Sequence, residues 1–129
     1  MCGASVLDLA YTYLHLSDGA AVSTVEVGPN FWATLRDRTD LQAGRLVVIT
    51  HAKEDWPIWE MHPAGDEVVS LLSGEVDLIL RDGSRESTVS LRGRATVIVP
   101  QGVWHRVVVH EPGDMLFITR GAGTQHRSV

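Results

Sequence analysis

The chain has very little of several features that would place it in a specialised class. Only one of its 129 residues is a cysteine, Cys2, so an internal disulfide is excluded and a reducing, cytoplasmic setting is expected. No apolar run approaches the length of a membrane span, which predicts no membrane contact. Aromatic residues make up 6% of the chain and are not interleaved with basic ones, and the formal net charge is −5, so we expect no nucleic-acid partner.

Two catalytic signatures are also missing from the sequence. No glycine-rich loop ends in lysine, which argues against a nucleoside triphosphate ligand, and no serine has a histidine partner nearby in the sequence. What is present is an ordinary composition, with 44% hydrophobic and 21% charged residues. Together with the length, this composition predicts a single globular domain with a sizeable hydrophobic core.

From residue 45 onward, short β-branched and apolar segments alternate with turn residues. This pattern is typical of an antiparallel sandwich or barrel. The strands expected from it cover residues 45–51, 57–62, 67–72, 75–81, 87–91, 96–99, 103–109 and 115–119. Residues 121–127 contain two glycines and are expected to form a loop.

The first 44 residues predict two strands and one short helix. The strands are expected at residues 11–16 and 21–27, and the helix at 31–35 with Asn30 as its N-cap. We expect residues 1–44 to be an extension that packs on a barrel formed by residues 45–129, the whole being one domain.

Four residues that can bind a divalent cation fall into two short segments of the chain. The first segment runs from Glu60 through His62 to Glu67, and the second ends at His105. Because a strand alternates its faces, Glu60 and His62 point to the same side. Residues 63–66 read as a turn, so we expect Glu67 to open the neighbouring antiparallel strand on that side. His105 follows a second turn and returns to complete the cluster.

This cluster has two interpretations. Two carboxylates buried together in an apolar barrel are costly unless their charge is balanced. Protons or histidinium ions would balance it in a hydrogen-bond network without metal. A divalent cation would balance it most simply, because two neutral histidines and two carboxylates neutralise the ion, and we favour this second interpretation.

The two segments resemble the paired motifs of the cupin superfamily. The first cupin motif is His-x-His, three or four residues, Glu, six residues, Gly, and the second ends in Pro-x-Gly-x-x-His. The chain matches these motifs at six positions: His62, Glu67, Gly74, Pro100, Gly102 and His105. Glu60 stands where the first histidine of the first motif usually lies.

The resemblance implies an all-β protein, a cupin-type antiparallel β-barrel or jelly roll with a short N-terminal helix. It implies one divalent ion per chain, iron(II), zinc, manganese or nickel, held by His62, Glu67, His105 and Glu60. Glu60 is either the fourth ligand or a catalytic general base with a raised pKa; its strand parity with His62 favours the ligand.

For function, the resemblance implies one of two classes. One is a small-molecule enzyme, either a dioxygenase or an isomerase, epimerase or lyase. The alternative is a non-catalytic cupin that binds or senses a small ligand. Leu71, Val103 and Val107 are expected to surround the open positions of the ion. Trp56 and His126 are candidates for the edge of the pocket.

The remaining histidines and tryptophans are expected outside the site. His15, His51 and His110 are interpreted as structural or exposed residues. Trp59 and Met61 alternate with Glu60 and His62, so they should project from the outer face of the barrel. Exposed apolar surface of this kind usually marks an interface, which predicts a symmetric homodimer to which the N-terminal segment contributes.

Overall fold

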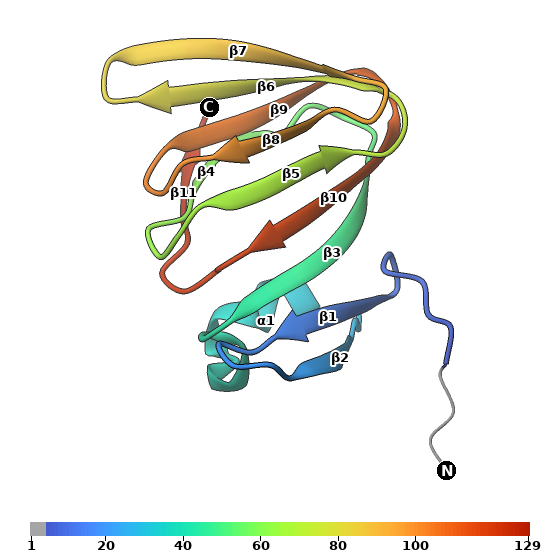
Figure 1. Cartoon of the computed structure of the whole chain (residues 1–129). Coiled ribbons are helices and arrows are strands. Elements are labelled where there is room, and N and C mark those ends of the chain that lie inside the picture. The colour runs from blue at the N-terminus through green and yellow to red at the C-terminus, as the bar shows by residue number, and fades with distance from the viewer. Residues whose placement is uncertain (1–4) are drawn as a thin grey trace.

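The computed structural model describes residues 5–129, which form eleven strands in two antiparallel sheets and one short helical segment (Figure 1). The first sheet contains, in spatial order, β2 (Val22–Glu26), β1 (Thr12–Leu16), β3 (Arg45–Ala52), β10 (Gly113–Thr119), β5 (Glu67–Leu71) and β8 (Thr96–Val99). The second contains β11 (Gln125–Ser128), β4 (Ile58–Met61), β9 (Trp104–Glu111), β6 (Glu75–Asp82) and β7 (Arg85–Arg92). The predicted antiparallel all-β architecture is confirmed.

The core lies between the two sheets and follows from the alternation of side chains along each strand. On β6, Val76 and Leu78 are buried, whereas Asp77 between them faces outward and is half-buried. Val107 on the adjacent strand β9 and Met115 on β10, in the other sheet, belong to the same core and are fully buried. Truncating a residue such as Leu78 to alanine should cost about 2–5 kcal/mol of unfolding free energy, because a close-packed core cannot refill the cavity.

Gly74 is required by the turn between β5 and β6. Its φ is +82°, a conformation that residues with a Cβ rarely adopt. A Cβ at this position would also lie 2.5 Å from the carbonyl oxygen of Glu111 and 2.7 Å from that of Pro112. The glycine of the first motif therefore has a structural role of its own, independent of any chemistry at the site.

The helical segment is short and begins where the sequence predicts it. It consists of α1 (Phe31–Thr34) followed by two 3₁₀ turns, η1 (Leu35–Asp37) and η2 (Thr39–Leu41). Asn30 occupies the N-cap position, but its side chain makes no capping hydrogen bond, so that part of the prediction is wrong. Packing holds the turn instead: the ring of Phe31 is buried 5.4 Å from that of Tyr13 in an edge-to-face arrangement.

The N-terminal strands belong to the same sheet as the rest of the fold. β1 pairs with both β2 and β3, so residues 12–26 extend the first sheet. The division into residues 1–44 and 45–129 stays a prediction. Among residues 5–129, no helix is long and apolar enough to cross a membrane.

The C-terminal segment differs from its prediction as a loop. Residues 125–128 form β11, which pairs with β4 along its whole length. The sequence Gln-His-Arg-Ser is polar and has no β-branched pattern, so the strand depends on tertiary contacts. One of these contacts is a cation–π interaction, in which the guanidinium of Arg127 lies 4.2 Å from the centroid of the Trp104 ring.

Trp59 is buried, contrary to the expectation that it forms exposed apolar surface. It has 5% of its area exposed, and the guanidinium of Arg81 lies 4.3 Å from the centroid of its ring. The stacked arginine covers the face that was expected to meet a second subunit. Trp59 therefore no longer supports the predicted homodimer, which stays a prediction.

Candidate metal centre

Both sheets contribute to the four-residue cluster. Glu60 lies on β4 directly opposite His105 on β9, in the second sheet. His62 follows the end of β4, and Glu67 is the first residue of β5, in the first sheet. The expectation that β5 neighbours β4 is wrong, because the turn at residues 63–66 carries the chain from one sheet to the other. The predicted residues converge nevertheless, since the two sheets face each other.

The side chains of the cluster lie close together in the interior. The Nε2 atom of His62 is 3.0 Å from one oxygen of Glu67, and the Nε2 atom of His105 is 3.1 Å from the other. Oε2 of Glu60 is farther away, at 3.8 and 3.7 Å from the same two nitrogens. His62, Glu67 and His105 are 5%, 2% and 0% exposed, respectively, whereas Glu60 is half-buried.

Hydrogen bonds on the far side of each ring orient the two histidines. Nδ1 of His105 lies 3.2 Å from the carbonyl oxygen of Val103, which can only accept, so we assign the proton of the neutral ring to Nδ1. Nδ1 of His62 lies 2.8 Å from the hydroxyl of Thr124, whose own proton is donated to the carbonyl of Gly121. Each ring, in its neutral form, therefore directs an Nε2 lone pair into the cluster, as metal binding requires.

Three buried polar atoms at the centre of the cluster have no hydrogen-bond partner among the described residues. They are Nε2 of His62, Nε2 of His105 and Oε1 of Glu67. Buried polar atoms are almost always satisfied, so three orphaned ones facing a common point need an explanation. A cation among them would satisfy all three at once.

The pKa values of the cluster follow from burial and from the mutual attraction of its members. Burial raises the pKa of Glu67, but the adjacent imidazoles of His105 and His62 outweigh it and lower that pKa to about 2. Burial lowers the pKa of His105, but the carboxylates of Glu60 and Glu67 raise it to about 9. For Glu60, burial is likewise outweighed by His105 and His62, so its pKa lies below the ordinary value. The raised pKa expected for Glu60 as a general base is thus wrong.

Two threonines that the sequence did not single out support the cluster. Thr119 on β10 donates a hydrogen bond to Oε2 of Glu67, and Thr124 holds His62 as described above. These hydroxyls are 52 and 62 residues away from their partners along the chain, so no local motif could identify them. They fix the orientation of two of the four cluster side chains.

His126 lies beside Glu60 on the side away from His105. The register of β11 and β4 pairs the two residues, and Nε2 of His126 is 3.2 Å from Oε1 of Glu60. The side chain of His126 is 53% exposed, so it stands between Glu60 and solvent. This contact engages one oxygen of Glu60 and leaves the other facing the two buried histidines.

The cluster opens into a cavity of about 720 Å³. The helical segment, β3, β4, β10 and the loop before β11 all contribute to its wall, and both Trp56 and His126 line it. The ring of Trp56 lies 6.0 Å from that of His105 and 6.0 Å from that of Phe117, centroid to centroid. Three residues expected at this wall, Leu71, Val103 and Val107, are instead buried in the core and do not line the cavity.

The other predicted histidines lie outside the cluster. Nε2 of His15 is 2.7 Å from the carbonyl oxygen of Ala43, and His110 pairs with Asp77 at 2.8 Å. His51 pairs with Asp114 at 2.9 Å and lies at the rim of the cavity.

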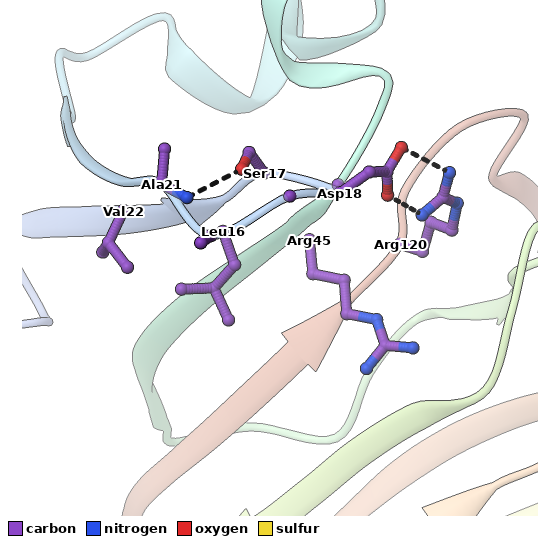
Figure 2. Close-up of a pocket in the computed structure, with 10 residues that line it drawn as sticks. Leu16, Ser17, Asp18, Ala21, Val22, Arg45 and Arg120 are labelled. Carbon is purple, nitrogen blue, oxygen red and sulfur yellow. Dashed lines mark hydrogen bonds and ion pairs between the residues drawn. The ribbon is translucent and has the colours of Figure 1, made fainter.

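A second, smaller cavity of about 390 Å³ lies at the β1–β2 hairpin (Figure 2). Figure 2 shows the guanidinium of Arg120 facing the carboxylate of Asp18. Its two terminal nitrogens donate hydrogen bonds of 2.6 and 3.2 Å to the two carboxylate oxygens. A Cβ at Gly65 would lie 3.6 Å from the Cδ of Arg120, so this arginine also packs against the turn that precedes Glu67. The Asp18–Arg120 pair thus connects the hairpin to the turn before Glu67. None of the four cluster residues lines the smaller cavity.

No protein-family model matches the sequence, and no curated protein matches it. Solved structures do. A cupin-2 domain protein from Shewanella frigidimarina has a TM-score of 0.51 at 20% identity, over 58% of this chain and 69% of that one. Oxalate decarboxylase of Bacillus subtilis, described with Mn(II) centres, has a TM-score of 0.54 at 16% identity, over 66% of this chain and 24% of that one. The iron(II) form of HppE in complex with substrate has a TM-score of 0.50 at 18% identity, over 58% of this chain and 42% of that one. This chain thus matches less than half of either enzyme, and at these identities the likeness is one of fold.

Proposed function

The chain has the cupin fold, and from this premise we propose that it holds one divalent metal ion inside its barrel and uses it in small-molecule chemistry. His62, Glu67 and His105 are the proposed ligands, with Glu60 beside them. Donor atoms of Glu60, His62 and His105 lie within 4.8 Å of one another, and the oxygens of Glu67 lie next to the two histidine nitrogens.

The donor geometry supports this assignment. Two ligands bound at about 2.1 Å and at right angles to each other are about 3 Å apart. The two histidine nitrogens lie 3.0 and 3.1 Å from the oxygens of Glu67, which is close to that separation. The orphaned atoms support it as well, because metal ligation would satisfy all of them.

Glu60 has two roles that its position allows. It is the fourth ligand if its side chain moves inward from the 3.7 and 3.8 Å that now separate it from the histidine nitrogens. It is a proton acceptor beside the ion if the contact with His126 holds it where it is. Its low pKa keeps the carboxylate ionised, which both roles require.

A divalent ion held by two histidines and one or two carboxylates supplies Lewis-acid polarisation or, as iron(II), a centre for oxygen chemistry. The residues of the chain orient the metal ligands and exclude water from the site. Thr124 and Thr119 hold His62 and Glu67, and the rings of Trp56 and Phe117 form an apolar wall near His105. An apolar wall strengthens electrostatic interactions with a bound molecule, because it lowers the local dielectric.

The single observation that carries the proposal is that three of the four donor residues, Glu60, His62 and Glu67, form part of the wall of a 720 Å³ cavity. A purely structural ion is normally enclosed by protein ligands, whereas a catalytic ion keeps positions accessible to small molecules. The cavity volume lies in the range typical of small-ligand sites. The proposal therefore favours an enzyme, a dioxygenase or an isomerase, epimerase or lyase, over a protein with a closed structural ion.

Binding of nitric oxide, a surrogate for oxygen, tests this proposal. Iron(II)-loaded protein under anaerobic conditions should give the electron paramagnetic resonance signal of an iron–nitrosyl species. Glu60→Ala should change that signal without abolishing iron binding, and the size of the change distinguishes a ligand from a neighbouring base. If neither nitric oxide nor azide binds to any metal form, the site is closed and the proposal is wrong. If both bind but no substrate is turned over, the binding or sensing alternative replaces the enzyme.

A further inference from the structure

The charged and histidine side chains that line the large cavity are paired, with one exception among residues 5–129. His62 and Glu67 are held by threonines, and Glu60 and His126 contact each other. His51, at the rim, pairs with Asp114. Among the charged and histidine side chains of this lining, Arg36 alone has no hydrogen-bond or ion-pair partner for its side chain within residues 5–129.

A neighbouring arginine differs from Arg36 in both its pairing and its place. Arg38, two residues further on, donates two hydrogen bonds to Asp40, at 2.9 and 2.8 Å, and does not line the cavity. Arg36 lies on η1, is exposed, and contributes to the lining of the cavity. A guanidinium has five donors in a planar fork that matches a carboxylate, so an unpaired one in a cavity wall is suited to recognising an anion.

Arg36 and the two carboxylates of the cavity come from different parts of the wall. Glu60 and Glu67 belong to the donor cluster at β4 and β5, whereas Arg36 comes from the helical segment. Between these elements the lining is largely apolar or aromatic, and it includes Trp32, Trp56 and Phe117. Trp56 and Phe117 pack against each other with their ring centroids 6.0 Å apart and their planes inclined by 31°, so they give this wall an aromatic character.

We propose that this cavity binds a small organic carboxylate with a flat, apolar body, and that Arg36 pairs with its carboxylate group. The inference deepens the proposed function, because the opposite end of such a ligand then faces the donor cluster. A singly charged carboxylate is favoured over a phosphate monoester, which carries about −1.5 to −2 at neutral pH. One guanidinium balances one negative charge, so the second charge of a phosphate monoester would stay unbalanced at this end of the cavity.

Isothermal titration of the zinc-loaded protein with benzoate tests the inference, with benzamide as the neutral probe of the same shape. Benzoate should bind the wild-type protein, and Arg36→Gln should weaken its binding by about tenfold or more, since a hydrogen-bonded charge is lost. The matched control, Arg38→Gln, removes a paired arginine outside the cavity and should change the affinity by less than about twofold, as expected for an exposed pair. Benzamide should bind more weakly than benzoate, and Arg36→Gln should not affect it.

Three results would overturn the inference. They are equal effects of the two arginine substitutions, equal binding of benzamide and benzoate by the wild-type protein, and tighter binding of phenyl phosphate than of benzoate. Repeating the titration after removal of zinc separates this inference from the proposed function. Arg36-dependent binding of benzoate to a protein that fails to bind zinc supports the anion site and contradicts the metal centre. If the protein binds zinc but Arg36→Gln does not change its affinity for benzoate, the anion site is wrong and the metal centre is not affected.

Discussion

His51 and His110 each lie within hydrogen-bond distance of an aspartate at the protein surface, and His62 and His105 lie nearly as close to Glu67 in the interior. The side chains of the surface pairs are partly exposed, so water can satisfy any polar atom that the partner residue does not. In the interior, the corresponding atoms are sealed from water, and three of them have no hydrogen bond. Histidine–carboxylate contacts are therefore solvated in one region, whereas in the other they leave buried polar atoms without a hydrogen bond.

This difference teaches that burial, and not residue type, marks the candidate centre. Exposed ion pairs contribute little to stability, because solvent and salt screen them. Buried charges are expensive and persist only when something compensates them. A cation in the interior cluster supplies that compensation, and each prediction below tests whether the two regions differ as this account requires.

The largest expected effect is on metal affinity. His62→Ala and His105→Ala should each lower the affinity for zinc by more than about a hundredfold, because substitution of residues that only support metal ligands already costs 10- to 100-fold. His110→Ala and His15→Ala should leave the affinity unchanged. Competition titration with a chromophoric chelator measures all four variants. Equal zinc affinities of all four variants would show that the interior histidines do not differ from the surface ones in metal binding.

The next largest effect concerns the support of His62. Thr124→Val keeps the shape of the side chain but removes the hydroxyl that fixes the ring, so zinc affinity should fall by about tenfold. Thr96→Val is the matched control, because Thr96 is exposed and its hydroxyl contacts that of Ser70 and none of the four cluster side chains. A similar loss in both variants would indicate a general effect on stability instead of ligand orientation.

The metal-free protein should have a stability that depends on pH on both sides of an optimum. Glu67 has a pKa of about 2 in the folded protein and an ordinary value of 4.5, so its contribution is present above pH 4.5 and is lost as the pH falls towards 2. His105 has a pKa of about 9 and an ordinary value of 6.5, so its contribution is present below pH 6.5 and is lost as the pH rises through 9. Denaturant unfolding should give the largest free energy between about pH 4.5 and 6.5. His105→Gln should flatten the alkaline decline, and a wild-type curve without that decline would contradict the assignment.

The smallest effect concerns assembly. Although Trp59 is covered, exposed apolar side chains remain on the N-terminal segment, including Tyr11, Val22 and Trp32. We expect a homodimer formed through this segment, and light scattering should return twice the mass of one chain. Trp32→Ser should shift the equilibrium towards the monomer. A single-chain mass for the wild-type protein at micromolar concentration would contradict the expectation.

Much of the fold and the core of the candidate site were predictable from the sequence, since both depend on local signals. Alternating apolar residues and turn residues located the strands, and the spacing around His62, Glu67 and His105 brought the cluster together. The errors came from tertiary contacts. The polar strand β11 forms by pairing with β4, Trp59 is covered by an arginine from β6, and the turn before Glu67 crosses between sheets. No sequence spacing encodes these contacts.

The supporting residues of the site were missed for the same reason. The hydroxyls of Thr119 and Thr124 reach Glu67 and His62 only after β10 and the following loop have folded against the barrel. Arg36 enters the cavity wall because the helical segment contributes to that wall. The motifs predict which side chains converge, and the fold decides what holds and surrounds them.

The most direct test of the central claim is the number of divalent ions bound per chain in the wild-type protein. Metal-free protein is equilibrated with zinc or manganese, dialysed against metal-free buffer, and analysed for metal and protein together. The account predicts close to one ion per chain, because the buried cluster presents donors already oriented towards one point. A value near zero for every divalent ion tested would mean that imidazolium charges alone balance Glu60 and Glu67, and it would contradict the account.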